Sequence, residues 1–484
     1  MLPELDGQGP LYQQLSRALR AAVEAGRLPA GGRLPSTREL AEALELSRNT
    51  VRAAYDHLVA SGVIASRHGS GAYALPAGPV PQGVGERNRI PPTSRYSART
   101  RAIHDYAAPR LHRGLRFNLQ YGEPLADALL PDTWRRELAR AAAYTSLGYP
   151  PMQGLPELRL EVARWLRERR GIDADADDIV IVAGAQQALS LAARVLLDED
   201  DTAVIEDPGY FGARWALQAH GARLVAVPVD GGGLVTDALP QARPGLIYVT
   251  PTHQFPLGVT LSARRRGELL RYANHHGTWI VEDDYDGELS YDGPPALPLR
   301  ALPESADHVI HVGSFSKLIA PSLRLAYLVA PRELRGDFVS AKLLCDLGCS
   351  AIEQAALAGF MRSGAFARHL RRVVRALRAR RNALITGLAR HAAPHLRVEK
   401  PGSGMHLVAW TTPGSRLHLP SLVRLAADTG VGLHPVMPHY MAQRAPPGLL
   451  LGYAGLSVAE IGLACRLLGP CIEQAARTGV DPAP

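Results

Sequence analysis

Apolar residues follow two different spacings along the chain, separated by a stretch that has neither. Over residues 1–75 they recur every three or four positions, as at Leu15 and Leu19, and two further groups with this spacing follow, which predicts three helices. Residues 63–75 then hold two short apolar runs around a glycine-bearing turn, which is typical of a hairpin. We therefore expect the first 75 residues to form three helices and two strands.

The stretch 76–115 has no sustained apolar period. It contains six prolines, at positions 76, 79, 81, 91, 92 and 109, and we interpret it as a linker of about forty residues. Seven arginines and only two acids give it a net charge near +5. A solvated tether explains this charge, and so does an arm that follows the phosphates of a nucleic acid, so both interpretations stay open.

Beyond residue 116, short apolar strands alternate with helical segments. The expected strands are 179–182, 202–205, 223–227, 246–248, 279–281, 309–312 and 325–329. Such alternation predicts an α/β fold with a mostly parallel sheet covered on both faces. Long helices rich in Arg, Ala and Leu, followed by an α+β pattern over about 335–475, predict a smaller companion domain within the third region, 116–484.

Composition limits where such a chain works. No apolar run reaches the roughly 18 residues of a membrane span, and the first six residues lack the pattern of a secretory signal. Four cysteines in 484 residues fit free thiols in a reducing compartment better than a disulfide framework. We therefore expect a cytoplasmic protein without membrane contact. The net charge of +8 is too modest to decide, alone, whether a nucleic acid is a partner.

Lysine occurs only three times, at positions 317, 342 and 400. Arginine supplies nearly all other positive charge, so a lysine at position 317 suggests that an amine is required there. An amine can form a Schiff base, whereas the guanidinium of arginine cannot. It ends the run Gly-Ser-Phe-Ser-Lys, in which Ser314 and Ser316 are suited to hold a phosphate. An aldehyde anchor beside a phosphate site is what pyridoxal phosphate requires.

Two helix starts in the N-terminal region carry polar residues that suit DNA. Ser36 and Ser47 are expected N-caps, and the second of these helices opens with Arg48, Asn49 and Thr50. Polar donors at the start of a recognition helix meet base edges and phosphates. A helical adaptor with a hairpin is the alternative for this region.

The N-terminal region resembles the GntR class of winged helix-turn-helix repressors. The resemblance is carried by Pro-Leu-Tyr at 10–12, Leu-Pro-Ser-x-Arg at 34–38 and Arg-His-Gly-Ser-Gly at 67–71. It implies that Arg38, Arg48 and Thr50 contact DNA, with Asn49 beside them at the helix start. It also implies that Arg67 and Gly69 lie in a wing near the backbone or minor groove.

Acids and a tyrosine follow a strand at 280–286, the edge where parallel sheets place ligands. A carboxylate there can pair with a pyridinium nitrogen, and a phenol can contact the 3′-oxygen of the same ring. Alternatively, these acids form a metal site or a solvated site. The turn before Ala185 opens a helix with free N–H groups for a phosphate. Tyr210 is placed to stack on a ring and Arg324 to hold the phosphate, although a core tyrosine and an ordinary ion pair explain them equally.

Six motifs occur in the order typical of fold-type I aminotransferases: Gly-Ala-Gln-Gln (184–187), Asp-Pro-Gly-Tyr (207–210), Thr-Pro-Thr-His-Gln-Phe-Pro-Leu-Gly (250–258), Glu-Asp-Asp-Tyr-Asp (282–286), Ser-Phe-Ser-Lys (314–317) and Arg-Leu-Ala-Tyr (324–327). With the N-terminal region, they make the chain resemble the MocR/GabR family of transcription regulators over essentially its full length. The resemblance implies a Schiff base of Lys317 with pyridoxal phosphate, Asp283 at the pyridine nitrogen, Tyr285 at the 3′-oxygen and Tyr210 on the ring. The residues it implies for the phosphate are the Ala185 backbone, Gln186, Ser314, Ser316 and Arg324. It also implies a homodimer, with Tyr149 crossing the interface.

Two positions depart from the aminotransferase pattern. Phe255 stands where these enzymes carry an asparagine that meets the 3′-oxygen, so His253 or Gln254 is expected to replace it. Leu450 stands where many of them carry an arginine that clamps the substrate carboxylate. Loss of that charge-assisted contact argues against efficient transamination of an ordinary α-amino acid.

These observations predict a homodimeric, pyridoxal-phosphate-dependent regulator. Its winged helix binds operator DNA, and its aminotransferase-like domain senses a small effector, either an amine or amino-acid-like ligand or pyridoxal phosphate itself. The alternative is a working aminotransferase with an accessory DNA-binding domain. A regulator that has lost the cofactor is disfavoured because every expected contact except the asparagine is present.

Overall fold

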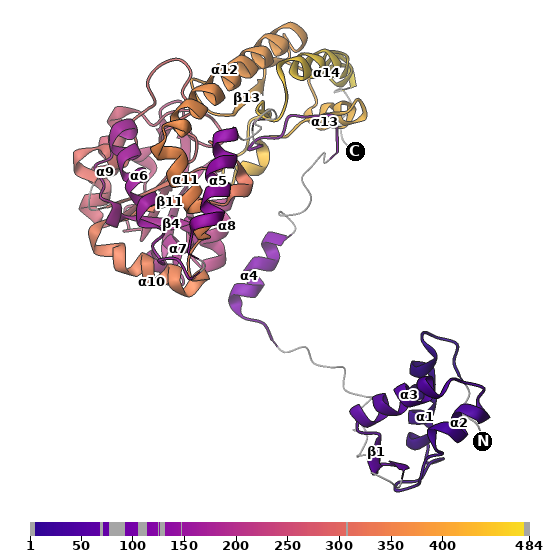
Figure 1. Cartoon of the computed structure of the whole chain (residues 1–484). Helices are drawn as coiled ribbons and strands as arrows, with labels where there is room; N and C mark the ends of the chain where they lie inside the picture. Colours follow the sequence, from indigo (N-terminus) through magenta and orange to yellow (C-terminus); the bar gives the residue numbers. More distant parts are fainter. Residues whose placement is uncertain are drawn as a thin grey trace. The chain divides into compact units, whose positions relative to one another are not determined.

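The computed structural model describes residues 5–67, 71–76, 92–104, 114–123, 125, 131–146, 148–305 and 308–478. These divide into two compact units, Met1–Pro92 and Thr93–Pro484, coloured along the sequence in Figure 1. The division falls inside the segment predicted to be a linker.

The N-terminal unit has the predicted three helices and hairpin: α1 (Leu11–Glu24), α2 (Thr37–Ala43), α3 (Arg48–Ala60), β1 (Ile64–Arg67) and β2 (Gly71–Ala74). Ser36 and Ser47 cap α2 and α3 as expected, since each side chain accepts a hydrogen bond from the backbone N–H three residues later. The two strands are antiparallel, with Ile64 opposite Ala74. Leu15, Leu19, Val51, Leu58 and Ile64 are among the buried side chains that join these elements in one core.

One helix was not predicted. Residues Arg95–His104, within the expected linker, form α4, which has too few apolar residues to show a helical period. Its stability comes from contact with α8 (Phe211–His220) in the large unit: Arg99 donates hydrogen bonds to the Ala219 and His220 carbonyls at 2.9 and 3.1 Å. Short helices are commonly formed by such tertiary contacts rather than by intrinsic propensity.

The large unit is built on an eight-stranded sheet in the order β4-β11-β10-β9-β8-β5-β6-β7. Its strands are β4 (Ile179–Val182), β5 (Thr202–Asp207), β6 (Arg223–Asp230), β7 (Gly233–Leu234), β8 (Leu246–Val249), β9 (Trp279–Asp284), β10 (Val309–Ser314) and β11 (Ala326–Val329). The pairs from β6 through β5, β8 and β9 to β10 are parallel, which confirms the predicted mostly parallel sheet.

Strand β11 is the exception among the central strands, because it runs antiparallel to both neighbours, β10 and β4. A parallel return needs a crossover of a dozen or more residues, usually through a helix. The connection from Ser314 to Ala326 contains only the short 3-10 turn Pro321–Leu323, so the chain turns straight back. This connection carries both Lys317 and Arg324.

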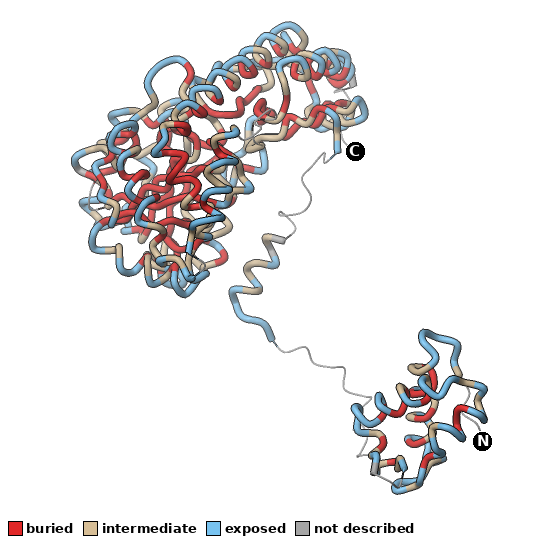
Figure 2. The backbone as a smooth tube through the Cα atoms, in the orientation of Figure 1, coloured by how far each residue is buried: buried red, intermediate tan, exposed pale blue. Residues whose placement is uncertain are grey.

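Both faces of the sheet are covered. On β4, Ile179 and Ile181 belong to one apolar core, and the alternating Val180 and Val182 belong to another. The helices that pack around the sheet are α5 (Asp132–Tyr144), α6 (Pro156–Trp165), α7 (Ala185–Leu196), α8, α9 (Ala263–His276), α10 (Arg335–Asp346) and α11 (Ala351–Arg362). Figure 2 shows the buried residues gathered in the interior of the large unit.

The predicted companion domain is present from α12 (Ala365–His391) onward, whereas α10 and α11, at the start of the predicted segment 335–475, pack with the helices of the large sheet. A three-stranded antiparallel sheet, β12 (Leu396–Val398), β13 (His406–Thr411) and β15 (Gly448–Gly452), lies with α12, α13 (Leu419–Asp428) and α14 (Val458–Thr478), as Figure 1 shows. A short parallel pair, β14 (Val431–Gly432) with β3 (Phe117–Asn118), brings the start of the large unit back to this domain. In the described part of the chain, no helix is long and apolar enough to cross a membrane.

Candidate functional site

The β10–β11 connection holds the lysine near the start of the large unit. Lys317 Nζ donates a hydrogen bond to the Gly122 carbonyl at 2.6 Å. Ser314, at the end of β10, accepts from the Ser316 backbone N–H at 3.2 Å, which fixes the turn that precedes Lys317. The Ser314 hydroxyl is thereby placed at the C-terminal end of β10, and the Ser316 hydroxyl and the Lys317 amine lie just beyond it.

Arg324 reaches the turn that opens α7. Its guanidinium donates to the Ala183 carbonyl at 2.6 Å, and a Cβ built on Gly184 would lie 2.8 Å from the same guanidinium. Gly184 has φ +102°, a conformation that favours glycine, so the close approach and the backbone both require this residue. The first N–H groups of α7, starting at Ala185, and the exposed Arg324 thus form one cradle suited to an anion.

Gln186 and Tyr210 are tied to the start of α8. The Gln186 side-chain amide donates to the Gly212 carbonyl at 2.9 Å, so this part of the side chain already has a protein partner. Tyr210 is the N-cap residue of α8, and its ring lies edge-on to Phe255 with centroids 5.8 Å apart. Burial raises the pKa of Tyr210 to about 12, so its phenol stays protonated.

Asp283 lies at the end of β9 with one unsatisfied oxygen. The residue is 3% exposed; Oδ2 accepts from the Tyr248 hydroxyl at 2.9 Å, whereas Oδ1 is buried without a hydrogen-bond partner in the described structure. Burial raises the pKa of Asp283 to about 7. A buried acceptor without a donor is costly, and a protonated pyridine nitrogen is a donor of matching charge. The residues present therefore fit the ring of pyridoxal phosphate.

Tyr285, His253 and Asp286 form a chain of polar contacts beside Asp283. The Tyr285 hydroxyl lies 3.0 Å from His253 Nδ1, which is 2.8 Å from Asp286 Oδ2. Burial raises the pKa values of Tyr285, well above its usual 10, and of Asp286. Of the two suggested replacements for the asparagine, His253 contacts Tyr285, whereas the Gln254 amide donates to the Pro208 and Phe255 carbonyls.

A buried ion pair supports the edge of the site. Arg170 and Asp284 are both nearly inaccessible, and the guanidinium holds the pKa of Asp284 below its usual value in spite of burial. The sequence did not predict Arg170 as the partner of Asp284, nor Tyr248 as the partner of Asp283. Neither Arg170 nor Tyr248 lies in a local motif; Tyr248 lies within an apolar strand, and only the pairing of β8 with β9 brings it to Asp283.

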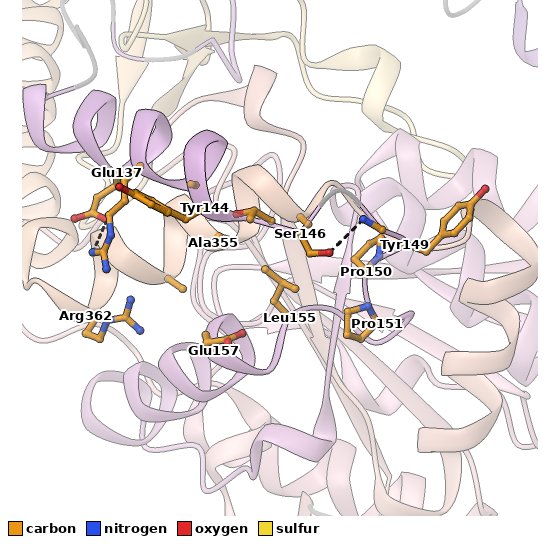
Figure 3. Close-up of a pocket in the computed structure, with 16 residues that line it drawn as sticks. Glu137, Tyr144, Ser146, Tyr149, Pro150, Pro151, Leu155, Glu157, Ala355 and Arg362 are labelled. Carbon is orange, nitrogen blue, oxygen red and sulfur yellow. Dashed lines mark hydrogen bonds and ion pairs between the residues drawn. The ribbon is translucent and has the colours of Figure 1, made fainter.

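Tyr149 lies apart from this cluster within one chain. The residue is 82% exposed and lines a surface cavity of about 410 Å³ between α5, the following loop and α11, shown in Figure 3. Tyr144 lines the same cavity and is 84% exposed.

Three of the predicted DNA-contacting residues, Arg38, Arg48 and Asn49, are exposed in the N-terminal unit. Arg48, Asn49 and Thr50 are the first three residues of α3, with Thr50 partly covered by a 2.8 Å contact to the Ser47 hydroxyl. Arg38 is exposed on α2 and pairs with Glu42. Arg67 ends β1, although its side chain is not described, and Gly69 lies outside the described residues.

Comparisons with known proteins match a different protein family to each of the two units. Residues 11–73 match the family described as bacterial regulatory proteins, gntR family, and residues 116–423 match aminotransferase class I and II. The probable rhizopine catabolism regulatory protein MocR of Rhizobium meliloti is 37% identical over 93% of this chain and 91% of its own length. The pyridoxine biosynthesis transcriptional regulator PdxR of Corynebacterium glutamicum is 33% identical over 91% of each chain.

Among solved structures, the large unit is similar to LysN, the α-aminoadipate aminotransferase of Thermus thermophilus. The TM-score is 0.71 at 29% identity, covering 80% of this chain and 98% of that one. The fold is therefore that of a fold-type I aminotransferase. With the GntR-type domain before it and full-length similarity to MocR and PdxR, the chain belongs to the MocR/GabR family of helix-turn-helix transcriptional regulators.

Proposed function

We propose that this DNA-binding regulator holds pyridoxal phosphate at Lys317 and senses a small effector at the same site. The observation that carries the proposal is the buried Asp283 Oδ1, which lacks a donor among the described residues. A carboxylate buried this way is unfavourable unless a cationic donor meets it, so the site is suited to a ligand rather than to stability alone. The structure of LysN contains a phosphopyridoxyl derivative of leucine, which supports the same cofactor here.

Each proposed contact uses a group described above. Pyridoxal phosphate, when bound, supplies an aldehyde that an amine can occupy and a ring that withdraws electrons. Asp283 holds the proton of the pyridine nitrogen, while Tyr285, positioned by His253, binds the 3′-oxygen. Tyr210 covers the ring. The phosphate is held by the Ala185 N–H, Gln186, Ser314, Ser316 and Arg324.

The proposed assembly is a cytoplasmic homodimer on operator DNA. Two tyrosines more than four-fifths exposed beside one cavity, Tyr144 and Tyr149, form a surface suited to burial by a second copy (Figure 3). Tyr149 then reaches the partner's cofactor. In each N-terminal unit, Arg48, Asn49 and Thr50 meet the DNA from the start of α3, with Arg38 nearby and Arg67 and Gly69 in the wing.

A working aminotransferase is the second candidate, because the large unit is similar to such enzymes, including an aromatic-amino-acid aminotransferase of Thermococcus litoralis that is 30% identical over 62% of this chain. Leu450 weighs against it, since this fully buried residue of β15 presents no charge to a substrate carboxylate. Single-turnover spectra with amino acids separate the candidates. Release of an oxo acid supports the enzyme, and a stable complex without turnover supports the sensor.

Borohydride reduction followed by peptide mapping tests the cofactor site. The purified protein should absorb at about 410–430 nm, as Schiff bases of this cofactor do, and reduction should fix the cofactor to Lys317. Lys317→Ala should remove the adduct, whereas Lys400→Ala, at an exposed lysine, is the matched control and should keep it. An adduct on Lys342 or Lys400 in the wild-type protein would refute the assignment.

A further inference from the structure

An apolar wall stands beside the proposed cofactor site. Leu450 of β15, Val408 of β13 and Phe255 form a separate buried cluster, and Leu450 pairs directly with Val408 across the two strands. Leu449 and Leu451 belong to the main core instead, so Leu450 points to the opposite face of β15. The aromatic side chains that pack against this wall are Tyr121, Tyr210, Tyr285 and Trp410.

The wall adjoins the amine of Lys317. Tyr121 packs on Phe255 with ring centroids 5.7 Å apart, and the next residue, Gly122, accepts the hydrogen bond from Lys317 Nζ. The ring centroids of His406 and Phe255 lie 5.3 Å apart. The positive charge of Lys317 lowers the pKa of His406, which indicates that the amine is near this ring. A molecule whose nitrogen replaces that of Lys317 therefore has this wall next to it.

Two imidazoles beside the wall, those of His406 and His439, have lowered pKa values and are neutral near pH 7. Burial lowers the pKa of His406 well below its usual value and lowers that of His439 to about 4. Two nearby cations lower the pKa values of rings beside the wall: Arg324 lowers that of Tyr210, and Lys317 lowers that of His406. The proposed function assigns both cations to the cofactor. A third cation, Arg214 of α8, lowers the pKa of His439 and is only partly buried. The side chains of Leu450, Val408 and Phe255 offer no hydrogen-bond donor, so a carboxylate placed against these three described residues would lose its water without gaining a partner from them.

We propose that the effector is a primary amine that carries an apolar or aromatic group and no carboxylate. The inference rests on the proposed function, since it needs the aldehyde held at Lys317. The neutral amine of the ligand would form a double bond to the aldehyde carbon, the double bond from that carbon to Lys317 Nζ would break, and two protons would pass from the ligand nitrogen to Nζ, which leaves as a free amine. Atoms and electrons balance without an oxidant or reductant. Leu450, Val408 and Phe255 then bury the apolar group of the ligand. Ligands are therefore selected by the shape of this group and by its lack of charge.

Matched pairs of ligands test this selectivity on the full-length protein with pyridoxal phosphate bound. 2-Phenylethylamine is compared with L-phenylalanine, and 3-methylbutylamine with L-leucine, because each pair differs only by the carboxylate. Dissociation constants come from the change in cofactor absorbance and, independently, from calorimetry. We expect each amine to bind at least about tenfold more tightly than its amino acid.

Variants at the wall extend the test. Leu450→Arg should reverse the order within each pair, because a guanidinium there gives the carboxylate a bidentate partner. Leu449→Met, on the other face of β15, is the control and should keep the wild-type order. The comparison of ligands on the wild-type protein does not depend on how well Leu450→Arg folds.

Three outcomes would overturn the inference: equal or tighter binding of the amino acids, no binding of either amine, or amino-acid binding that Arg214→Ala abolishes. The last would assign the carboxylate to Arg214. Failure of the proposed function is distinguishable, since the wild-type protein would then lack both the absorbance band and the reducible bond to Lys317.

Discussion

The unpaired carboxylate of Asp283 leads to a prediction about stability in the protein freed of its cofactor. Because burial raises the pKa of Asp283 from 3.8 to about 7, the folded chain keeps a proton that the unfolded chain loses near pH 4. Stability is therefore lost progressively as pH rises between these values, since the charged form is disfavoured only in the folded state. Asp283→Asn, which carries no charge, should escape this loss.

The magnitude follows from the same values. A rise from 3.8 to about 7, at about 1.4 kcal/mol per pH unit, makes the charged carboxylate cost about 4 kcal/mol at pH 8. At pH 5.5 the cost is about 2 kcal/mol by the same arithmetic. The amide of the variant leaves its own unpaired group, but that penalty is the same at every pH. The difference in unfolding free energy between variant and wild type should therefore grow by about 2 kcal/mol from pH 5.5 to pH 8.

Urea unfolding followed by tryptophan fluorescence measures this difference. All five tryptophans lie between residues 134 and 410, so the signal reports on the large unit alone. A difference that stays constant or shrinks as pH rises would refute the assignment of a raised pKa to Asp283. With pyridoxal phosphate bound, the order should reverse, because the pyridinium proton then pairs with the carboxylate and the variant loses that partner.

Three further changes have defined outcomes. Arg170→Met should destabilise the large unit by about 3–5 kcal/mol in urea, because Asp284 is left buried without its guanidinium. Tyr248→Phe should cost about 1–2 kcal/mol of cofactor affinity, measured by absorbance titration, by removing the donor to Asp283. Arg48→Ala should cost about 1–3 kcal/mol in operator binding at fixed salt, measured by fluorescence anisotropy, with the cofactor spectrum unchanged; unaltered binding would count against its placement on a base.

Local signals predicted the elements that carry the site. Helical spacing and the caps Ser36 and Ser47 located the N-terminal helices, since a cap bonds within three residues of itself. Alternating strands and helices predicted the parallel sheet, and hence that residues after β9 and β10 share an edge. Lys317 and Asp283 are brought to that edge by topology alone, because adjacent parallel strands end together.

Features that depend on distant contacts could not be predicted this way. The hydroxyl of Tyr248 meets Asp283 only through the register of β8 with β9, and Arg170 reaches Asp284 across more than a hundred residues. Helix α4 has no apolar period to reveal it. Its residues become helical because arginines bind the end of another helix, which no local pattern records.

Helix α8 joins the proposed cofactor site to the segment that leads to the DNA-binding unit. Tyr210 is the N-cap residue of α8, and at the C-terminal end of this helix Arg99 of α4 binds the Ala219 and His220 carbonyls and Glu199. A guanidinium is well suited there, because the last carbonyls of a helix lack internal partners and carry partial negative charge. A shift of Tyr210 on ligand binding would therefore reach α4 through ten residues of continuous helix.

Arg99→Ala tests this connection. Loss of its hydrogen bonds to two carbonyls and one carboxylate should weaken the docking of α4 by about 2 kcal/mol, which is about a 30-fold faster amide hydrogen exchange over residues 95–104. Arg101→Ala is the control, because Arg101 donates to Thr93 within the same segment and should leave exchange unchanged.

The decisive measurement is operator affinity with and without pyridoxal phosphate and effector. If α4 transmits the ligand state of the cofactor site, Arg99→Ala should keep the cofactor spectrum but lose the ligand-dependent change in operator affinity. The reason is that effector and DNA are coupled only if both change the equilibrium of the same structural element, here α4. Faster exchange in α4 together with unchanged coupling would show that the signal bypasses this helix. The linker would then act only as a tether, as its proline content alone suggests.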